Sequence, residues 1–90
     1  MATLTVNILW RLRAVKQLAK ISKSIQSQIE KAVDTLYDWP NVKHIKKLVN
    51  RNDYRLAVGR YRVLFTINPN GSITVIHIEE VKKRDDRTYK

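Results

Sequence analysis

The chain has 90 residues, of which 43% are hydrophobic, and its 18 Lys and Arg against 8 Asp and Glu give a formal net charge of +10. This composition predicts one folded domain over residues 1–90 with an anionic partner, such as nucleic acid, an acidic protein or a membrane surface. The absence of cysteine excludes disulfides and thiolate metal sites, and no apolar run approaches the ~20 residues of a bilayer span, so we expect a soluble cytoplasmic protein without metal or cofactor.

The first predicted elements are a strand and two helices. Alternation with polar residues predicts a strand with one buried face at Leu4, Val6 and Ile8. From about Trp10 the apolar residues recur at helical spacing, which predicts a helix over roughly 11–21. A second apolar stripe follows Ser22 and Ser24, both suitable N-caps, and ends at Trp39-Pro40. Because the helices follow each other directly, we expect them to pack as an antiparallel hairpin.

Strands are predicted in the second half of the chain. Residues 41–52 form a basic connector that its apolar side chains anchor to the core. Alternating runs on both sides of Gly59-Arg60 predict a β-hairpin, and a second turn at 69–71 leads to a further strand over 73–78. The predicted fold class is therefore α+β, with the order β-α-α-β-β-β and the helices on one face of an antiparallel sheet.

The two-residue turn fixes which hairpin residues share a face. It places on the core face the pairs Val58–Tyr61, Leu56–Val63 and Tyr54–Phe65. Arg55 then lies opposite Leu64, and Ala57 opposite Arg62, on the other face. We therefore expect Arg55 and Arg62 to project from an open face, offset diagonally and close enough to bind one phosphate group together. The short Ala57 leaves a dip beside Arg62.

Positive charge is concentrated in the middle of the chain and at its C-terminal end. Residues 41–66 hold seven basic side chains and one acidic side chain. The second cluster consists of Lys82, Lys83, Arg84, Arg87 and Lys90. Tyr89, within this tail, could stack on a base. The structural alternatives are an ordinary solvated sheet face and a frayed, charged C-terminus.

Three segments, taken together, resemble the RelE/ParE superfamily of bacterial toxins: 15-VKQLAKI-21, 46-KKLVNRNDYRLAVGRYRVLFTI-67 and 83-KRDDRTYK-90. The resemblance covers nearly the whole chain, and the stretch YRLAVGRYRVLF is its most specific part. It implies the same β-α-α-β-β-β order, with helices against one face of an antiparallel sheet. It also implies a toxin–antitoxin system in which a protein antitoxin binds the toxin, in a complex that is often multimeric.

The superfamily has two branches with different targets. RelE-like members enter the ribosomal A site and cut mRNA, whereas ParE-like members inhibit DNA gyrase. The RelE branch is favoured by retained residues at the family's basic and closing positions: Arg55, Arg62, Arg84 and Tyr89. The resemblance therefore implies a ribosome-dependent mRNA endonuclease that inhibits translation. Two departures are Ala57, where a further Lys or Arg is frequent, and Lys83, where many relatives have His. A gyrase inhibitor and a relative that only binds are the alternatives.

RNA cleavage by attack of the ribose 2′-OH needs cations for the phosphate, a proton acceptor and a proton donor. The expected catalytic group is Arg55, Arg62, Lys83, Arg84 and Tyr89. Arg62 and Arg84 suit the phosphate because a guanidinium stays charged and binds two oxygens. The proton acceptor stays open among Lys83, Lys46, Lys47, His77, Glu79 and Glu80. We expect further RNA contacts from Lys43, Lys46, Lys47, Arg51, Lys82 and Arg87.

Overall fold

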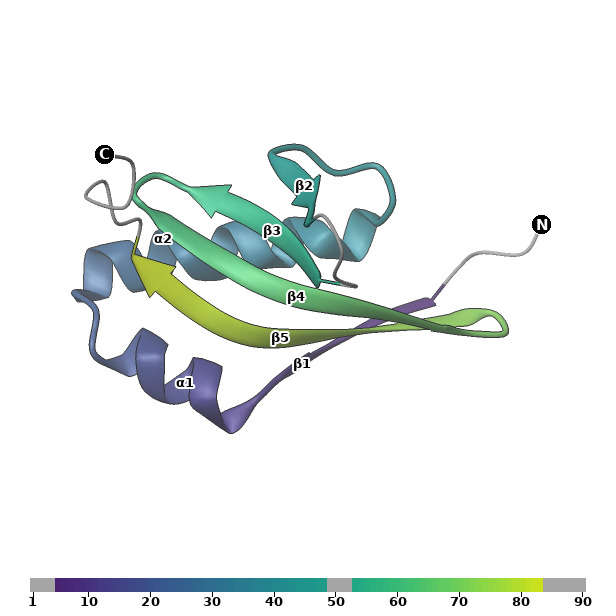
Figure 1. Cartoon of the computed structure of the whole chain (residues 1–90), viewed down its shortest axis with the longest axis horizontal. Helices are drawn as coiled ribbons and strands as arrows, with labels where there is room; N and C mark the ends of the chain where they lie inside the picture. Colours follow the sequence, from purple (N-terminus) through teal and green to yellow (C-terminus); the bar gives the residue numbers. More distant parts are fainter. Residues whose placement is uncertain (1–4, 49–52, 84–90) are drawn as a thin grey trace.

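A computed structural model of the chain, described here for residues 5–48 and 53–83, contains a five-stranded sheet and two α-helices (Figure 1). The helical elements are α1 (Leu12–Ala19), α2 (Lys23–Asp34) and a 3₁₀ turn, η1 (Thr35–Asp38). The strands are β1 (Thr5–Trp10), β2 (Ile45–Lys47), β3 (Asp53–Val58), β4 (Tyr61–Asn70) and β5 (Ile73–Lys83). The predicted α+β class and element order are confirmed, with β2 as an additional short strand in the expected connector.

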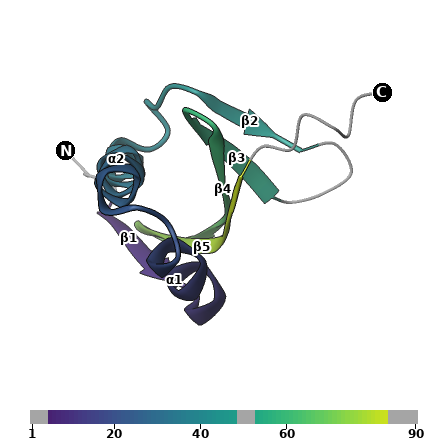
Figure 2. The same cartoon turned by 90° about the vertical axis from the view of Figure 1, so that its left-hand side faces the viewer.

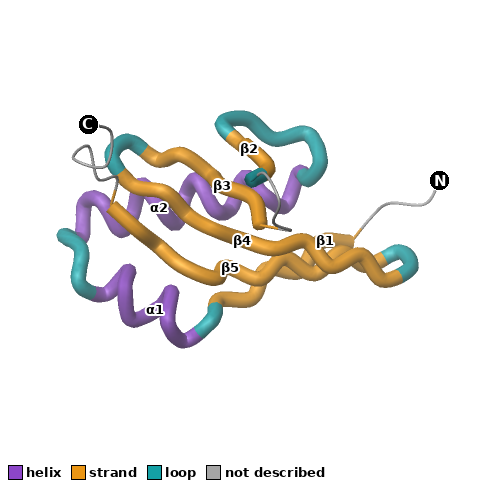
Figure 3. The backbone as a smooth tube through the Cα atoms, in the orientation of Figure 1, coloured by secondary structure: helices purple, strands orange, loops and turns teal. Residues whose placement is uncertain are grey.

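The strand order across the sheet is β1-β5-β4-β3-β2. β1 pairs with β5 in parallel, and every other neighbouring pair is antiparallel. The first and last described strands therefore lie side by side, as the tube in Figure 3 makes clear. This parallel pair is the one long-range pairing that local periodicity did not predict.

The helices and one face of the sheet form a single core (Figure 2). α1 packs mainly on β5, whereas α2 packs on β3 and η1. The two helices are therefore held in place by their contacts with the sheet more than by contacts with each other along a helical hairpin. The largest fully buried side chains of this core are Phe65, Ile29, Leu36, Ile76, Ile78, Val33 and Val63. Tyr54 stacks on Phe65 with ring centroids 5.6 Å apart, and Trp39 meets both rings edge-on. This aromatic cluster fixes the segment after η1 to the β3–β4 hairpin.

The predicted register of the β3–β4 hairpin is confirmed at every pair. Gly59 adopts a φ of 56°, a left-handed conformation that glycine tolerates at little cost, and so allows the two-residue turn. The second turn lies at 71–72 rather than at 69–71, because Asn70 still pairs with Ile73. Pro69 can remain within β4 because that strand extends past the described start of β3, where a proline need not donate to a neighbour.

A β-bulge in β5 changes the face of the sheet on which Lys82 and Lys83 lie. Leu64 pairs with Glu80 but Phe65 pairs with Ile78, so Glu79 is the extra residue. The bulge inverts the alternation that follows, and Val81 becomes a buried core residue. Lys82 consequently lies opposite Arg62, while Lys83 lies opposite Tyr61.

Candidate functional site

The sheet face turned away from the helices carries the candidate site. One row across the strands runs from Lys46 through Arg55 and Leu64 to Glu80, and the next contains Ala57, Arg62 and Lys82. Neighbouring strands are about 4.8 Å apart, so the side chains in a row are within reach of one another. We call the four cations Lys46, Arg55, Arg62 and Lys82 the basic patch. The register therefore brings together residues that lie 36 positions apart in the sequence.

Carboxylates neutralise one margin of the basic patch. Glu80 Oε1 lies 3.6 Å from Lys82 Nζ and 3.9 Å from Arg13 Nη1. In the neighbouring position, Glu79 lies 3.4 Å from Arg11 Nε and accepts a 3.1 Å hydrogen bond from Thr66 Oγ1. Within residues 5–48 and 53–83, neither Arg55 nor Arg62 forms an ion pair. Both residues are half-buried on this face.

The remaining candidate residues are distributed over several places. Lys83 lies opposite Tyr61, which packs against the core, and alternation therefore places Lys83 on the other side of the sheet from Arg62. Lys43 lies on the loop before β2, beside a mainly apolar cavity next to the end of α2. Lys47 pairs with Tyr54 at the far end of β2. Four of the predicted residues lie outside the described part of the chain: Arg51, Arg84, Arg87 and Tyr89.

The candidate proton acceptors also have definite positions. His77 pairs with Thr66 on the open face, which resolves the face that its sequence pattern left undetermined. Glu79 is paired with Arg11, which immediately precedes α1, and Glu80 lies near Arg13 of α1 and Lys82 of β5, as expected of salt-bridge partners. No group of three or more His, Cys, Asp or Glu side chains could hold a metal ion in the described ranges. None of the described helices has the length and apolar character to cross a membrane.

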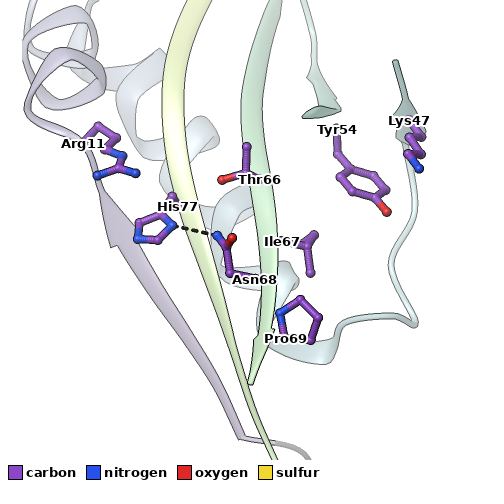
Figure 4. A pocket seen from close by; sticks show the side chains of 8 residues that line it. All are labelled: Arg11, Lys47, Tyr54, Thr66, Ile67, Asn68, Pro69 and His77. Atoms are coloured by element: carbon purple, nitrogen blue, oxygen red, sulfur yellow. Dashed lines mark hydrogen bonds between the residues drawn. The ribbon is translucent and has the colours of Figure 1, made fainter. Parts of the chain in front are cut away.

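A second feature is a polar cavity of about 480 Å³ toward the other end of β4, lined by residues of the open face together with Tyr54, Ile67 and other residues that alternate with the core face (Figure 4). Its lining consists of Arg11, Lys47, Tyr54, Thr66, Ile67, Asn68, Pro69 and His77. Asn68 and His77 meet across β4 and β5, with Asn68 Nδ2 3.0 Å from His77 Nδ1. The sequence alone did not predict that these residues line one cavity. The alternation of Thr66 and Asn68 was the available signal, but it needed the β4–β5 register to bring in His77.

A cationic patch next to a cavity lined by amide, hydroxyl, imidazole and phenol groups is suited to a polyanion that also carries hydrogen-bonding edges. Phosphate groups bind to guanidinium and ammonium groups, whereas amides and hydroxyls can also bind nucleobase edges. The sheet face thus has the chemistry of a surface for single-stranded nucleic acid.

Comparison with protein families gives a match over residues 8–86, to the family described as the ParE toxin of the type II toxin–antitoxin system parDE. No curated protein sequence matches the chain. Similar solved structures were found in archaea and bacteria.

The RelE–RelB complex from Pyrococcus horikoshii OT3 contains a chain with 26% sequence identity and a TM-score of 0.74, with 92% of this chain and 99% of that one covered. The isolated Escherichia coli RelE toxin has 18% identity and a TM-score of 0.73, covering 88% and 84% respectively. A chain of the Mycobacterium tuberculosis toxin–antitoxin complex RelBE2 has 23% identity and a TM-score of 0.70, covering 90% and 100%. The structural similarity to the last two establishes the fold alone.

Proposed function

The chain belongs to the ParE toxin family of type II toxin–antitoxin systems, and from this premise we propose that it acts as a metal-independent endoribonuclease on mRNA at the ribosome. The observation that supports this activity most directly is the position of Arg55 and Arg62, diagonally across β3 and β4 on an open sheet face and without ion pairs among the described residues. Two such guanidinium groups can bind the non-bridging oxygens of one phosphate.

In the proposed reaction, the ribose 2′-oxygen attacks the adjacent phosphorus in line and the bond from phosphorus to the 5′-oxygen breaks. The proton of the 2′-OH passes to a base, and the departing 5′-oxygen takes up a proton. The products are a 2′,3′-cyclic phosphate and a 5′-OH end. Arg62 would stabilise the charge that develops on the pentacovalent phosphate, and Arg55 would hold the substrate. The proposed catalytic group also includes Arg84 and Tyr89, whose positions lie outside the described residues.

We propose that a protein antitoxin binds this toxin in the cytoplasm, in a complex that can be multimeric. The similar chain from Pyrococcus horikoshii was solved together with RelB, which supports a partner of that kind. The net charge of +10 favours an acidic antitoxin segment, because such a segment would neutralise the surface that RNA needs.

Inhibition of DNA gyrase is the second candidate function. It is favoured by the family match itself, which is to ParE toxins, and by the sequence of the open face. Ala57 stands beside Arg62 where a further cation would assist cleavage, and Glu80 bonds to the neighbouring Lys82. A binding function needs neither a proton acceptor nor a complete set of cations.

The experiment that tests the proposal compares Arg62→Ala with Arg60→Ala in a translation extract and in a gyrase supercoiling assay. Both variants remove one positive charge, but Arg60 lies in the exposed β3–β4 turn rather than in the basic patch. We expect wild type and Arg60→Ala to cut mRNA, and Arg62→Ala to lose about 10²- to 10³-fold in rate, as expected for loss of a preorganised donor. Primer extension measures the cleavage, and circular dichroism checks that each variant folds.

Each outcome has a clear meaning. Uncut mRNA together with blocked supercoiling by the wild-type protein would overturn the endoribonuclease proposal in favour of gyrase inhibition. Equal cleavage by Arg62→Ala and Arg60→Ala would reject the role of the basic patch. If wild type affects neither translation nor supercoiling but binds RNA, the chain is a binding-only relative.

A further inference from the structure

We propose that the polar cavity over β4 and β5 is a base-reading subsite, which binds the base of a nucleotide that flanks the phosphate held by the basic patch. The inference rests on the proposed function for the nature of the ligand, single-stranded RNA. It adds a determinant of sequence preference that lies apart from the reacting phosphate. Its central elements are Asn68, His77 and Thr66, with Tyr54 on the β3 side (Figure 4).

The hydrogen bond between Asn68 and His77 determines what the pair can offer a ligand. The carboxamide Nδ2 of Asn68 donates to His77 Nδ1 over 3.0 Å when the imidazole is neutral. The hydrogen of the neutral ring then lies on Nε2, and the Oδ1 atom of Asn68 remains an acceptor. The pair therefore presents one donor and one acceptor. Because Asn68 is exposed and His77 half-buried, a ligand in the cavity can reach both side chains.

A donor beside an acceptor matches a nucleobase edge better than a phosphate. Phosphate oxygens only accept, so a phosphate would meet the Asn68 carbonyl oxygen unfavourably, whereas base edges carry donors and acceptors side by side. Two cations line the cavity, and one of them, Arg11, lies 3.4 Å from Glu79; only Lys47 is without an ion pair among the described residues, which leaves this end less cationic than the basic patch. The side chain of Tyr54 and the ring of Pro69 add apolar surface for a base.

The position of the cavity makes it a neighbouring subsite rather than part of the reacting centre. Arg62, Thr66 and Asn68 all lie on β4, at alternating positions of the same face. At about 3.3 Å per residue, Thr66 is ~13 Å and Asn68 ~20 Å from Arg62 along the strand. A phosphate held by Arg62 would therefore place a nucleotide beyond the scissile one over the cavity. Leu64 lies between Arg62 and Thr66 on this face and so separates the two sites.

The test uses the full chain and a pool of short single-stranded RNAs with randomised sequence. Asn68→Ala removes the acceptor and His77→Ala removes the ring donor, and Asn70→Ala is the matched control on the same strand and face but outside the cavity. Sequencing the cleaved ends gives the relative rate for each base at each position. We expect both cavity variants to lose about five- to tenfold of the preference at one position beside the cut, and Asn70→Ala to retain it.

A second measurement does not depend on cleavage. The imidazole resonances of His77 in the wild type are followed by NMR during titration with trinucleotides of different sequence, with His77→Ala used for assignment. Resonance shifts that depend on the trinucleotide sequence support the subsite even if no RNA is cut, in which case the proposed function alone fails. Unchanged cleavage preference in both cavity variants, or shifts that are absent or identical for all trinucleotides, overturns the subsite while leaving wild-type cleavage as separate evidence.

Discussion

The two faces of the sheet use the same strands for different purposes. Along β4, Val63 and Phe65 are completely buried against the helices, whereas Arg62 before them and Thr66 after them stay half-exposed on the open face. Successive residues therefore alternate between a packed environment and a solvated one. Substitutions on the covered face should mainly change the free energy of unfolding, whereas those on the open face should mainly change ligand binding and catalysis.

Leu64 is the exception to this division. It belongs to the open face but is only 8% exposed, in the row that also contains Arg55 and Glu80. Long charged side chains cover apolar surface with their methylene groups, so the cations of this face also have a packing role. The two faces therefore differ in degree, and measurements on single residues can test how far their roles are separate.

The largest effect should come from Phe65→Ala. Phe65 is fully buried and contacts the rings of Trp39 and Tyr54, so truncation removes apolar burial and leaves a cavity. We expect the free energy of unfolding to fall by about 3–5 kcal/mol. Urea denaturation measures the loss, and Thr66→Val on the opposite face should lose about 1 kcal/mol or less. Equal losses in the two variants would contradict the division between the faces.

The next effect concerns the turn that determines which residues reach which face. At Gly59, φ is 56° and an added Cβ would meet no atom within 4 Å, so Gly59→Ala tests backbone conformation without a clash. We expect a loss of about 1–2 kcal/mol in the free energy of unfolding. Gly59→Asn should lose less, because asparagine adopts left-handed conformations more readily than alanine does. Thermal denaturation compares the variants, and no difference between them would argue against a backbone cause.

The hairpin register shows what local sequence can predict. The two-residue turn and period-two alternation were enough to pair Arg55 with Leu64 and Arg62 with Ala57. β2 was not predicted because three residues within a basic connector carry no readable period, and its pairing with β3 uses backbone groups. The parallel pairing of β1 with β5 joins distant segments, and periodicity contains no information on partners.

The site was predicted less completely, for a physical reason. A strict alternation continued past Ile78 predicts Lys83 on the open face. Because of the bulge at Glu79, Lys82 lies on that face instead, opposite Arg62. The cavity has the same dependence, since Asn68 and His77 meet only through the β4–β5 register. Residue types and turns predict the basic face, whereas its partners across strands depend on tertiary pairing. The catalytic roles remain proposals.

The smallest effect on stability, and a direct measure of the open face, is expected for Lys46→Met. Lys46 is exposed and lies opposite Arg55 at the edge of the basic patch, so its loss should change the free energy of unfolding by no more than about 0.5 kcal/mol. If its ammonium group contacts an RNA phosphate, one fewer counterion is released on binding. The slope of log affinity against log salt concentration should then decrease in magnitude by ~0.7.

Fluorescence titration with a single-stranded RNA at several salt concentrations measures this slope. Lys31→Met on α2 is the charge-matched control and should keep the wild-type slope, because it lies on the helix layer that covers the other face. Equal decreases in both variants would show that RNA responds to the total charge of +10 rather than to the open face.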